Sequence, residues 1–413
     1  MREKADSDLV RRQNRSLVLD ALRQHGSMAR TELGRHTGLS PASITSISGQ
    51  LIAEGLIKEQ DGAIVIGIRQ RRGRPLVQLE INPAATNIVV VKLSIDGIEL
   101  VLADFSGAIA AREVQHIETY DANAHEFGPL VAGEIAAFLA KHKVKRSSVT
   151  RISVAVQGVT NSQEGTIVWS PGMAARNIPV CGPVIKLLGI PCAVANDANL
   201  MAEALIGSDP QRFCGTSAII FIGYGVGMGL IINGQVYHGA TGSASEFGHM
   251  NHVPGGPLCR CGRHGCIEAF AADYAIVRMA RGEDNAAPPL NSRVPEDAMA
   301  ELEARARQGD KNALRAFIKA GEALGFGLAR IVSVISLEHI MIAGPGTRAM
   351  ALIEPALRCA FAEGLVAELR RSVDIETIPV HNDMIVRGGI EDALHHLDRE
   401  VFAAGLSLTA ESA

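Results

Sequence analysis

Residues 246–268 read EFGHMNHVPGGPLCRCGRHGCIE, and this stretch decides how the rest of the chain is interpreted. It gathers one histidine and three cysteines: His249, Cys259, Cys261 and Cys266. One imidazole and three thiolates form a complete tetrahedral ligand set for a structural zinc ion. Because the spacing H-x9-C-x-C-x4-C is not that of a zinc finger, the number of ligands carries this prediction.

Two alternatives remain for this stretch. His252 and His264 offer other imidazoles, and the cysteines could form a redox or incidental cluster. A set of four protein ligands leaves no open position for metal catalysis, so we expect the zinc to hold a loop. The flanking Glu246 and Glu268 would then be aimed by that loop.

Around this stretch, from residue 87 onward, short apolar strands alternate with helices. The Asn233-Gly234 pair predicts a tight hairpin turn, and Asn196-Asp197 directly follows a buried strand and opens a helix. The pattern predicts an α/β body of two lobes with a cleft between them. The expected strands are 88–94, 99–104, 109–117, 149–156, 192–195, 216–222, 228–232 and 340–343. The expected helices are 126–141, 197–206, 313–336 and 349–365.

Residues 1–82 predict a winged helix-turn-helix. Apolar residues of 9–25 share one helical face, and a short helix at about 30–36 ends at Gly38. Ser40-Pro41 supplies an N-cap and a first-turn proline for a helix that continues to about residue 54. In that helix we expect an inward apolar face and an outward polar face. The inward residues are Ile44, Ile47 and Leu51, and the mostly outward ones are Ser43, Thr45, Ser46, Ser48 and Gln50. Strand-like segments at 63–68 and 77–81 predict a β-hairpin wing around RQRRGRP at 69–75.

The helix that follows Ser40 is expected to enter a DNA major groove. Its candidate contacts with bases and phosphates are Ser40, Ser43, Thr45, Ser46 and Gln50. The wing arginines Arg69, Arg71, Arg72 and Arg74 are expected to meet phosphates or an adjacent minor groove. The alternative is that the module does not bind DNA and that these arginines are merely solvated.

Charge supports the DNA interpretation once the chain is divided. The 413 residues carry a formal net charge of −4, which alone argues against a nucleic-acid binder. Residues 1–80, however, hold 13 Lys and Arg against 9 Asp and Glu, whereas the rest holds 27 against 35. A mildly basic head on an acidic body fits a specific reader better than a strongly cationic nonspecific binder.

The sequence also indicates in which cellular compartment the protein is expected. The charged start MREKAD is not followed by an apolar segment typical of a secretory signal, and the apolar stretch 218–232 is interrupted by glycines. We therefore expect a cytoplasmic protein with no membrane association. Cys181, Cys192, Cys214 and Cys359 are scattered, which does not suggest a disulfide framework.

Three motifs carry a resemblance to a known family: VANDAN at 194–199, ASEFGHM at 244–250 and CRCGRHGCIE at 259–268. Together they closely resemble the ROK family of repressors, open reading frames and sugar kinases, over nearly the whole chain. The resemblance implies an actin-like, two-lobed fold with a sugar bound between the lobes. It also implies that the histidine and the three cysteines are zinc ligands.

The resemblance further implies a sugar site of Asn196, Asp197, Glu246, His249 and Glu268. In kinase members the aspartate that matches Asp197 is the general base. Carboxylates and amides suit a polyol on chemical grounds alone. A helix N-cap is the structural alternative for Asn196-Asp197, and both roles are compatible.

The nucleotide elements depart from the kinase pattern. Lys92 stands where kinase members carry an aspartate, and Ser94, Ile95 and Asp96 replace Gly-Gly-Thr. Gly223-Tyr224-Gly225 places a phenol where a small hydroxyl is usual, and the third loop reads Ala343-Gly344-Pro345-Gly346. We therefore expect no ATP binding and no catalytic residue, with Asp197 as a vestigial base. The turn at 170–174 also lacks an asparagine that many members carry, which leaves the identity of the sugar open.

These features predict a transcriptional regulator, with repression of carbohydrate-metabolism genes favoured, whose operator affinity responds to a sugar or sugar phosphate. The alternatives are an ATP-dependent sugar kinase with an appended DNA module, and a regulator controlled by a protein partner. Two-fold dimers or tetramers would pair heads on a pseudo-palindromic operator. The expected parts are a head at 1–82, a first lobe at 83–196, a second lobe at 197–380, and a C-terminal helix at 381–413 that packs back on the first lobe.

Overall fold

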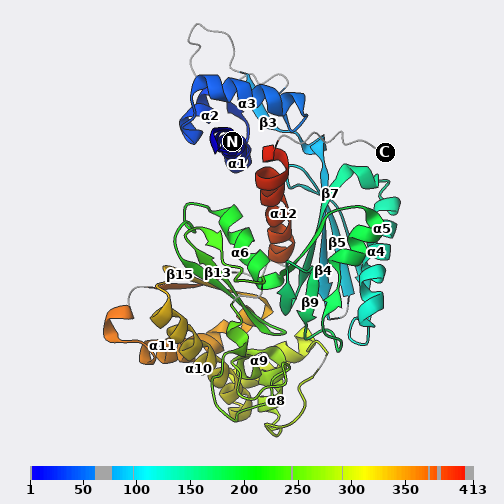
Figure 1. The fold of residues 1–413 in the computed structure, drawn as a ribbon. Coiled ribbons are helices and arrows are strands. Elements are labelled where there is room, and N and C mark those ends of the chain that lie inside the picture. Colours follow the sequence, from blue (N-terminus) through cyan, green and yellow to red (C-terminus); the bar gives the residue numbers. More distant parts are fainter. Residues whose placement is uncertain are drawn as a thin grey trace.

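The structure is a computed structural model, and it describes residues 2–60, 77–95, 97–242, 245–290, 292–370, 373–378 and 383–404, with side chains from residue 9. A small helical head stands on a larger body of two lobes, and helix α12 (Met384–His396) lies between all three (Figure 1). Among the described residues, no helix combines the length and apolar character needed to cross a bilayer.

The head is three helices and a small antiparallel sheet of order β1-β3-β2. Helix α3 begins where predicted, because the Ser40 hydroxyl accepts a hydrogen bond from the Ser43 backbone N–H at 3.2 Å and Pro41 occupies the first turn. Strand β2 pairs with β3, but the expected strand at 63–68 and the four wing arginines Arg69, Arg71, Arg72 and Arg74 lie outside the described residues. The elements are α1 (Arg2–His25), β1 (Met28–Ala29), α2 (Arg30–Thr37), α3 (Pro41–Ala53), β2 (Ile57–Glu59) and β3 (Gln78–Ile81).

The first lobe is built on a five-stranded mixed sheet of order β11-β7-β4-β5-β6. The predicted meander is present, with β4 antiparallel to β5 and β5 antiparallel to β6. Helices α4 and α5 cover one face of this sheet through an apolar core. The strands are β4 (Asn87–Ser94), β5 (Gly97–Asp104), β6 (Ile109–His116), β7 (Val149–Val156) and β11 (Cys192–Asn196), and the helices are α4 (Ala124–Lys141) and α5 (Cys181–Leu188). A small sheet of β8 (Val159–Asn161), β9 (Thr166–Trp169) and β10 (Ile178–Pro179) extends from it.

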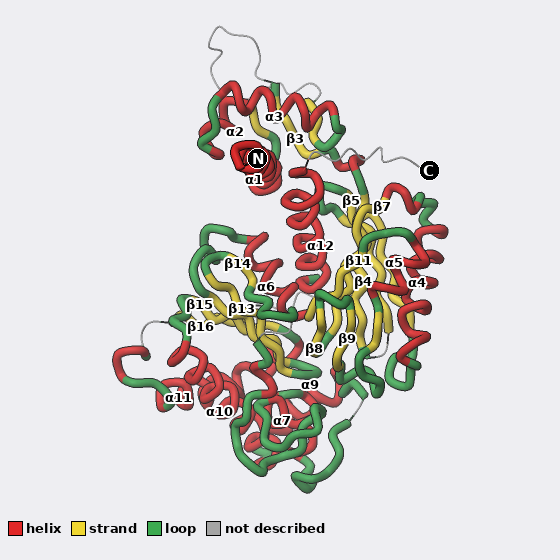
Figure 2. Tube along the Cα trace, viewed as in Figure 1, coloured by secondary structure: helices red, strands yellow, loops and turns green. Residues whose placement is uncertain are grey.

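The second lobe repeats this plan with the sheet order β14-β13-β12-β15-β16. Asn233 and Gly234 make its predicted hairpin turn, both at positive φ. Figure 2 shows α10 and α11 on one side of the sheet and α6 on the other. The strands are β12 (Ser217–Ile222), β13 (Val226–Ile232), β14 (Gln235–Val236), β15 (His339–Ala343) and β16 (Asp374–Thr377). The helices are α6 (Asp197–Ser208), α7 (Glu268–Ala271), α8 (Asp273–Ala280), α9 (Glu296–Arg307), α10 (Lys311–Val334) and α11 (Met350–Glu363).

Helices α6 and α12 cross between the lobes with their backbones in close contact. A Cβ added at Gly388 of α12 would lie 1.6 Å from the carbonyl oxygen of Leu200 in α6. A Cβ at the next residue, Gly389, would lie 2.9 Å from the Val90 side chain of β4. The glycine pair therefore lets α12 touch a helix of the second lobe and the central sheet of the first lobe at one point.

The head and the first lobe share one apolar core. Leu19, Leu33 and Ile44 of the head belong to the same buried cluster as Val90 of β4 and Ile390 of α12. The chain after α12 forms a single π-helical turn (Leu397–Val401) and a short 3-10 turn (Phe402–Ala404) that lie against α1. Residues 384–404 thus lie on the first-lobe sheet and also reach the head.

Candidate functional site

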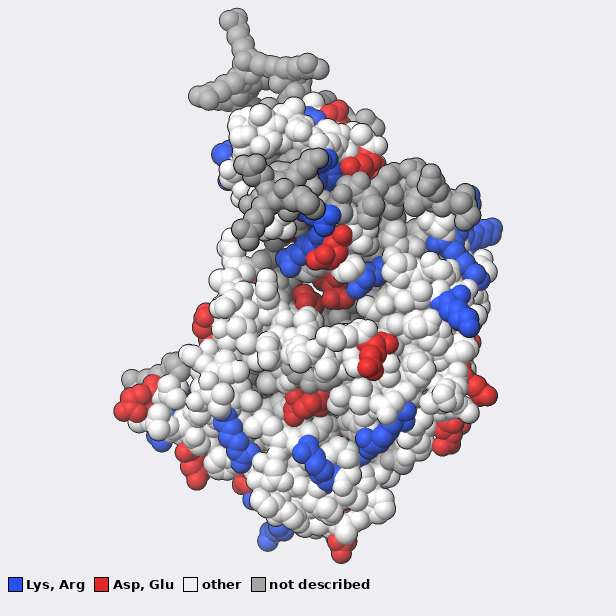
Figure 3. All heavy atoms as spheres, in the orientation of Figure 1, with Lys and Arg blue, Asp and Glu red and all other residues white. Residues whose placement is uncertain are grey.

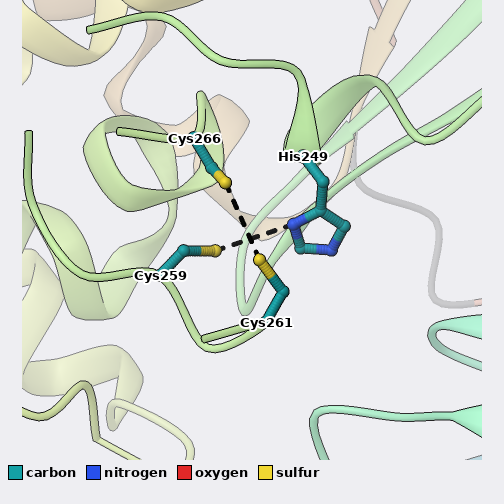
Figure 4. A group of neighbouring side chains, drawn as sticks. All are labelled: His249, Cys259, Cys261 and Cys266. Atoms are coloured by element: carbon teal, nitrogen blue, oxygen red, sulfur yellow. Dashed lines mark hydrogen bonds between the residues drawn. The ribbon is translucent and has the colours of Figure 1, made fainter. Parts of the chain in front are cut away.

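The structure brings His249 and the three cysteines of the motif together (Figure 4). Their ligand atoms all lie within 4.8 Å of one another. Cys259 Sγ is 3.6 Å from His249 Nδ1, and Cys261 Sγ is 3.7 Å from Cys266 Sγ. A tetrahedral ion bonded to sulfur at about 2.3 Å and nitrogen at about 2.0 Å separates its ligand atoms by roughly 3.5–3.8 Å, so these four residues fit a metal ion.

The other two imidazoles of the stretch face elsewhere. The His252 ring packs edge-on against Phe270 at 5.0 Å, and His264 Nδ1 lies 2.9 Å from the carbonyl oxygen of Gly256. His249 is therefore the imidazole that joins the cysteines. While its Nδ1 faces them, its Nε2 lies 3.8 Å from a carboxylate oxygen of Glu246.

The cysteine loop is tied to the cleft by arginines that sequence reasoning did not single out. Arg260, between Cys259 and Cys261, donates to the carbonyl oxygen of Tyr224 at 2.6 Å and stacks over the Tyr274 ring at 4.3 Å. Arg263 donates to the carbonyl oxygen of His249 at 2.7 Å. The loop thereby fixes both the Tyr224 turn and the histidine.

A small pocket beside this cluster collects the predicted sugar residues. Asn196, Asp197, Glu246, His249 and Glu268 all line it. Gln157 and Trp169 line it as well, and sequence reasoning missed both. Trp169 is the single tryptophan of the chain, which was an available signal, and its ring meets His249 edge-on at 5.3 Å.

Asn196 serves as the N-cap of α6. Its side-chain oxygen accepts from the backbone N–H groups of Ala198 and Asn199, and its amide nitrogen donates to the carbonyl oxygen of Gly158 at 2.7 Å. Most of its hydrogen-bonding capacity is therefore used within the protein. The cap holds the neighbouring Asp197 at the mouth of the pocket.

The carboxyl groups of Asp197, at the start of α6, and Glu268, at the start of α7, occupy different environments. Burial away from bulk water raises the pKa of Asp197 to about 7, although the side chain still borders the cleft. Glu268 is 3% exposed, accepts from the Val226 N–H at 3.3 Å, and receives the Tyr274 hydroxyl at 3.4 Å. Asp197 is therefore poised to exchange a proton near neutral pH, whereas Glu268 is held by its neighbours.

A larger cavity of about 450 Å³ opens between the lobes and shares Gln157, Asp197 and Phe221 with the small pocket. Residues that replace the expected nucleotide motifs line it, among them Lys92, Ser94, Ile95 and Tyr224. Asp96 lies outside the described residues.

The glycines of the second loop pack closely against other parts of the protein. A Cβ at Gly223 would lie 3.0 Å from the Pro345 ring. At Gly225 it would lie 2.4 Å from the Gln157 amide nitrogen and 2.8 Å from a Glu268 oxygen. Any side chain at either position would therefore force these neighbours to shift.

In the head, the predicted inward residues of α3 are buried, and the polar face is mixed. Thr45 and Ser46 are exposed, and Ser40 and Ser43 border solvent at the start of the helix. Ser48, expected to point outward, is fully buried, because its hydroxyl accepts a hydrogen bond from Arg30 at 3.0 Å. The Gln50 oxygen accepts from Arg11 at 3.0 Å and Arg15 at 3.3 Å, so its side chain is already engaged.

A family model described as "ROK family" matches residues 91–391. The chain belongs to the ROK family. The DNA-binding transcriptional dual regulator NagC of Escherichia coli K12 is 28% identical over 363 residues, which cover 87% of each chain. The DNA-binding transcriptional repressor Mlc of the same organism is 25% identical over 397 residues, 94% of this chain and 95% of Mlc.

Solved structures agree with this ROK assignment and extend it to the head. A ROK family transcriptional regulator described as a homolog of E. coli Mlc superposes with a TM-score of 0.78 at 25% identity, covering 96% of this chain and 99% of that one. A ROK glucokinase from Streptomyces griseus, solved with glucose and AMPPNP, gives a TM-score of 0.57 at 24% identity over 74% of this chain. That similarity concerns the two-lobed fold.

Proposed function

We propose that this protein is a DNA-binding transcriptional regulator, a repressor of carbohydrate-metabolism genes, whose operator affinity is set by a sugar or sugar derivative in the interlobe cleft. One observation carries this proposal: a continuous path of contacts joins the cleft to the recognition helix. Helix α6 begins at the sugar-site pair Asn196-Asp197, crosses α12 at Gly388, and the turns after α12 contact α1 of the head.

The last step of that path is made by arginines of α1. Arg15, fully buried, donates to the carbonyl oxygen of Phe402 and to the carboxylate of Glu54, the C-cap residue of α3. Arg23 forms an ion pair with the fully buried Asp398 and stacks over Phe105 of the first lobe at 4.4 Å. A shift of α12 relative to the sheet would therefore move α3.

The head would read DNA with the start and exposed face of α3. Ser40, Ser43, Thr45 and Ser46 are available at this surface, and Gln50 would contribute only after leaving its arginine partners. The wing arginines Arg69, Arg71, Arg72 and Arg74 are proposed to add phosphate or minor-groove contacts. Two heads of a two-fold dimer, alone or within a tetramer, would span half-sites about 34–36 Å apart.

Figure 3 supports a local rather than a global attraction to DNA, because basic and acidic side chains are interspersed over this face of the lobes. For the sugar to act, it must bind one lobe arrangement better than the other. A tenfold change in operator affinity needs about 1.4 kcal/mol of such coupling.

We infer that the ion held by His249, Cys259, Cys261 and Cys266 is zinc with a structural role, because imidazole and thiolates suit zinc and fill all four positions. When bound, the ion neutralises the thiolates and locks the loop. The chain's own groups then position the cleft: His249 presents Nε2 to Glu246, and Arg260 holds the Tyr224 turn.

The second candidate is a sugar kinase, favoured by Asp197, whose pKa near 7 suits a general base. Lys92, Ile95 and Tyr224, which replace the expected nucleotide motifs, oppose it, and we propose that kinase activity and ATP binding are lost. A coupled assay of ADP release with ATP and a panel of sugars separates the regulator from the kinase. A kinase would release ADP, and the Asp197→Asn variant would abolish that release.

The regulator proposal is tested by operator binding. The full chain is used to select DNA from a random pool, and fluorescence anisotropy then measures affinity for the selected site with and without a panel of sugars, sugar phosphates and sugar acids. We expect at least one compound to change the affinity tenfold or more. Selection of no specific DNA would overturn the function, and specific DNA unaffected by every compound would indicate control by a protein partner.

A further inference from the structure

Lys92 occupies an unusual place for a lysine. It lies on β4, the central strand of the first-lobe sheet, between Val91 and Leu93, which are both buried. Its side chain is 24% exposed and lines the 450 Å³ cavity. A lysine is seldom largely buried unless its ammonium is paired, so the partners of Lys92 indicate its role.

Those partners leave the ammonium only partly compensated. Among the described residues, Lys92 Nζ makes one hydrogen bond, to Glu99 at 3.3 Å, although an ammonium has three donors. Glu99 also accepts from Arg112, whose other nitrogen pairs with Asp383. Two cations therefore share Glu99, and within the described part of the chain the remaining donors of Lys92 have no protein partner, so they can bind a ligand in the cavity.

The opposite wall carries a cation too. Arg293 lines the cavity from the second lobe, stacks over the Tyr224 ring at 4.2 Å, and is 3.9 Å from Glu296. Among the described residues, the acidic groups that line the cavity are Glu99 and Asp197, and burial favours the protonated form of Asp197. The described lining is thus weighted toward positive charge from both lobes.

The cavity also adjoins the small pocket. Gln157, Asp197 and Phe221 line both spaces, so these three side chains form the boundary that a ligand occupying both would have to pass. The small pocket offers amide and carboxyl groups suited to a polyol, whereas the large cavity offers an ammonium and apolar walls such as Ile95 and Met201.

We propose that the effector is an anionic sugar derivative whose polyol lies in the small pocket and whose phosphate or carboxylate lies against Lys92 in the interlobe cavity. The inference rests on the proposed sugar-sensing function and specifies its ligand class. The anion takes the place where a kinase would hold transferable phosphate, and no bond is made or broken. An anion between Lys92 and Arg293 would draw the two lobes together.

Titration calorimetry with the full chain tests this proposal. The probes are neutral pentoses, hexoses and N-acetylhexosamines, each beside its phosphate ester, together with hexuronic acids. We expect one anionic compound to bind at least tenfold more tightly than its neutral parent. The phosphate and carboxylate arms tell which anion is used.

Variants locate the charge. Lys92→Met is expected to weaken the affinity for the anionic compound at least tenfold and to change the affinity for the neutral sugar by less than twofold. Lys92→Arg is expected to restore most of the preference for the anionic compound. Lys141→Met is the control, because Lys141 is an exposed lysine of the same lobe paired with Glu113. Neutral sugars that bind as well as all their anionic derivatives would overturn the proposal while keeping a sugar sensor. If Lys92→Met is folded, as checked by circular dichroism, and loses affinity equally for the anionic compound and the neutral sugar, the proposal is also overturned. Absence of any sugar binding would instead contradict the proposed function.

Discussion

The guanidinium of Arg15 donates two hydrogen bonds to the carbonyl oxygen of Phe402, at 3.1 and 2.9 Å, across 387 positions of sequence. The same guanidinium donates to Glu54 at the end of α3 at 3.1 Å. One buried side chain therefore connects the segment after α12 to the helix proposed to read DNA.

Replacing Arg15 with methionine should uncouple this connection. The variant leaves Glu54 and the Phe402 carbonyl without their donor, and because Glu54 is 19% exposed we expect a loss of about 2–3 kcal/mol in unfolding free energy. Urea unfolding measures it. Arg12→Met, at an exposed position of the same helix, should change stability by less than about 0.5 kcal/mol. Equal stability of the two variants would contradict the role given to Arg15.

Gly388→Ala should force α6 and α12 apart, because the added methyl would lie 1.6 Å from the Leu200 carbonyl oxygen. Backbone cannot yield as a flexible side chain would, so we expect a loss of at least about 2 kcal/mol and a weaker response of operator binding to effector. The matched control is Gly133→Ala in α4, where nothing lies within 4 Å of the new Cβ. That control should stabilise the protein by about 0.5–1 kcal/mol.

Asp197→Asn should make stability less dependent on pH. Burial raises the folded-state pKa of Asp197 from 3.8 to about 7 because it disfavours the charged carboxylate. The contribution of this group to stability is therefore fully present below pH 4, where the carboxyl is protonated, and is lost as pH rises toward and through 7. The asparagine variant should therefore be more stable than the parent at pH 8, by about 1 kcal/mol given that the side chain borders the cleft, and should match it near pH 4. Unfolding free energies across this range measure the difference.

Asp310→Asn is expected to change the pH dependence of stability in the opposite direction. Hydrogen bonds from the Ala313 backbone and from Arg305 lower the pKa of this exposed N-cap, so its contribution is present at neutral pH and lost in acid. A parent and an Asp197→Asn variant with parallel stability curves would refute the assignment for Asp197.

Cys261→Ala should abolish metal binding and destabilise the loop. Because binding energy of a structural zinc is folding energy, we expect the variant to lose more than about 3 kcal/mol and a strong chelator to lower the thermal midpoint of the parent. Metal analysis by atomic emission measures occupancy. Cys214→Ala, an exposed cysteine outside the cluster, should retain one zinc per chain. Full zinc content in the Cys261→Ala variant would refute the ligand set.

Thr45→Ala should weaken operator binding without affecting stability. Thr45 is exposed on α3, and its hydroxyl donates to the Pro41 carbonyl oxygen at 2.8 Å, so the hydroxyl oxygen can still accept a hydrogen bond from DNA. Loss of one such contact per head is expected to cost about 1–3 kcal/mol of operator binding. Ser333→Ala is the control, because Ser333 makes the same bond to Ala329 on α10, far from the head. Equal effects of both variants on anisotropy titrations would exclude Thr45 from the interface.

Local patterns predicted much of the fold. The sheets follow period-two apolar alternation and buried runs, and the starts of α3 and α6 follow from Ser40 and Asn196 as caps. The His249 cluster was also predictable, because the four ligands lie within 18 residues of sequence and their chemistry is distinctive.

The remainder depended on contacts between distant segments. Ser48 was assigned to the outward face from helical period alone, but Arg30 approaches it from α2 and buries it. Gln157 and Trp169 line the small pocket through the arrangement of β7 to β9, which the order of residues does not reveal. That Phe402 lies against Arg15 follows from where α12 is placed on the sheet.

The core shared by head, sheet and α12 limits how this protein can be recombined. A head cut from the body near residue 82 would lose the contacts of α1 with the turns after α12, among them the hydrogen bonds of Arg15 to Phe402 and the ion pair of Arg23 with Asp398. A chimera that exchanges only residues 1–82 with another regulator would have to recreate the Arg15, Arg23 and Phe105 contacts with foreign partners. Successful exchange should therefore require the segment 383–404 to travel with its own head, so the two ends of the chain are expected to evolve as one unit.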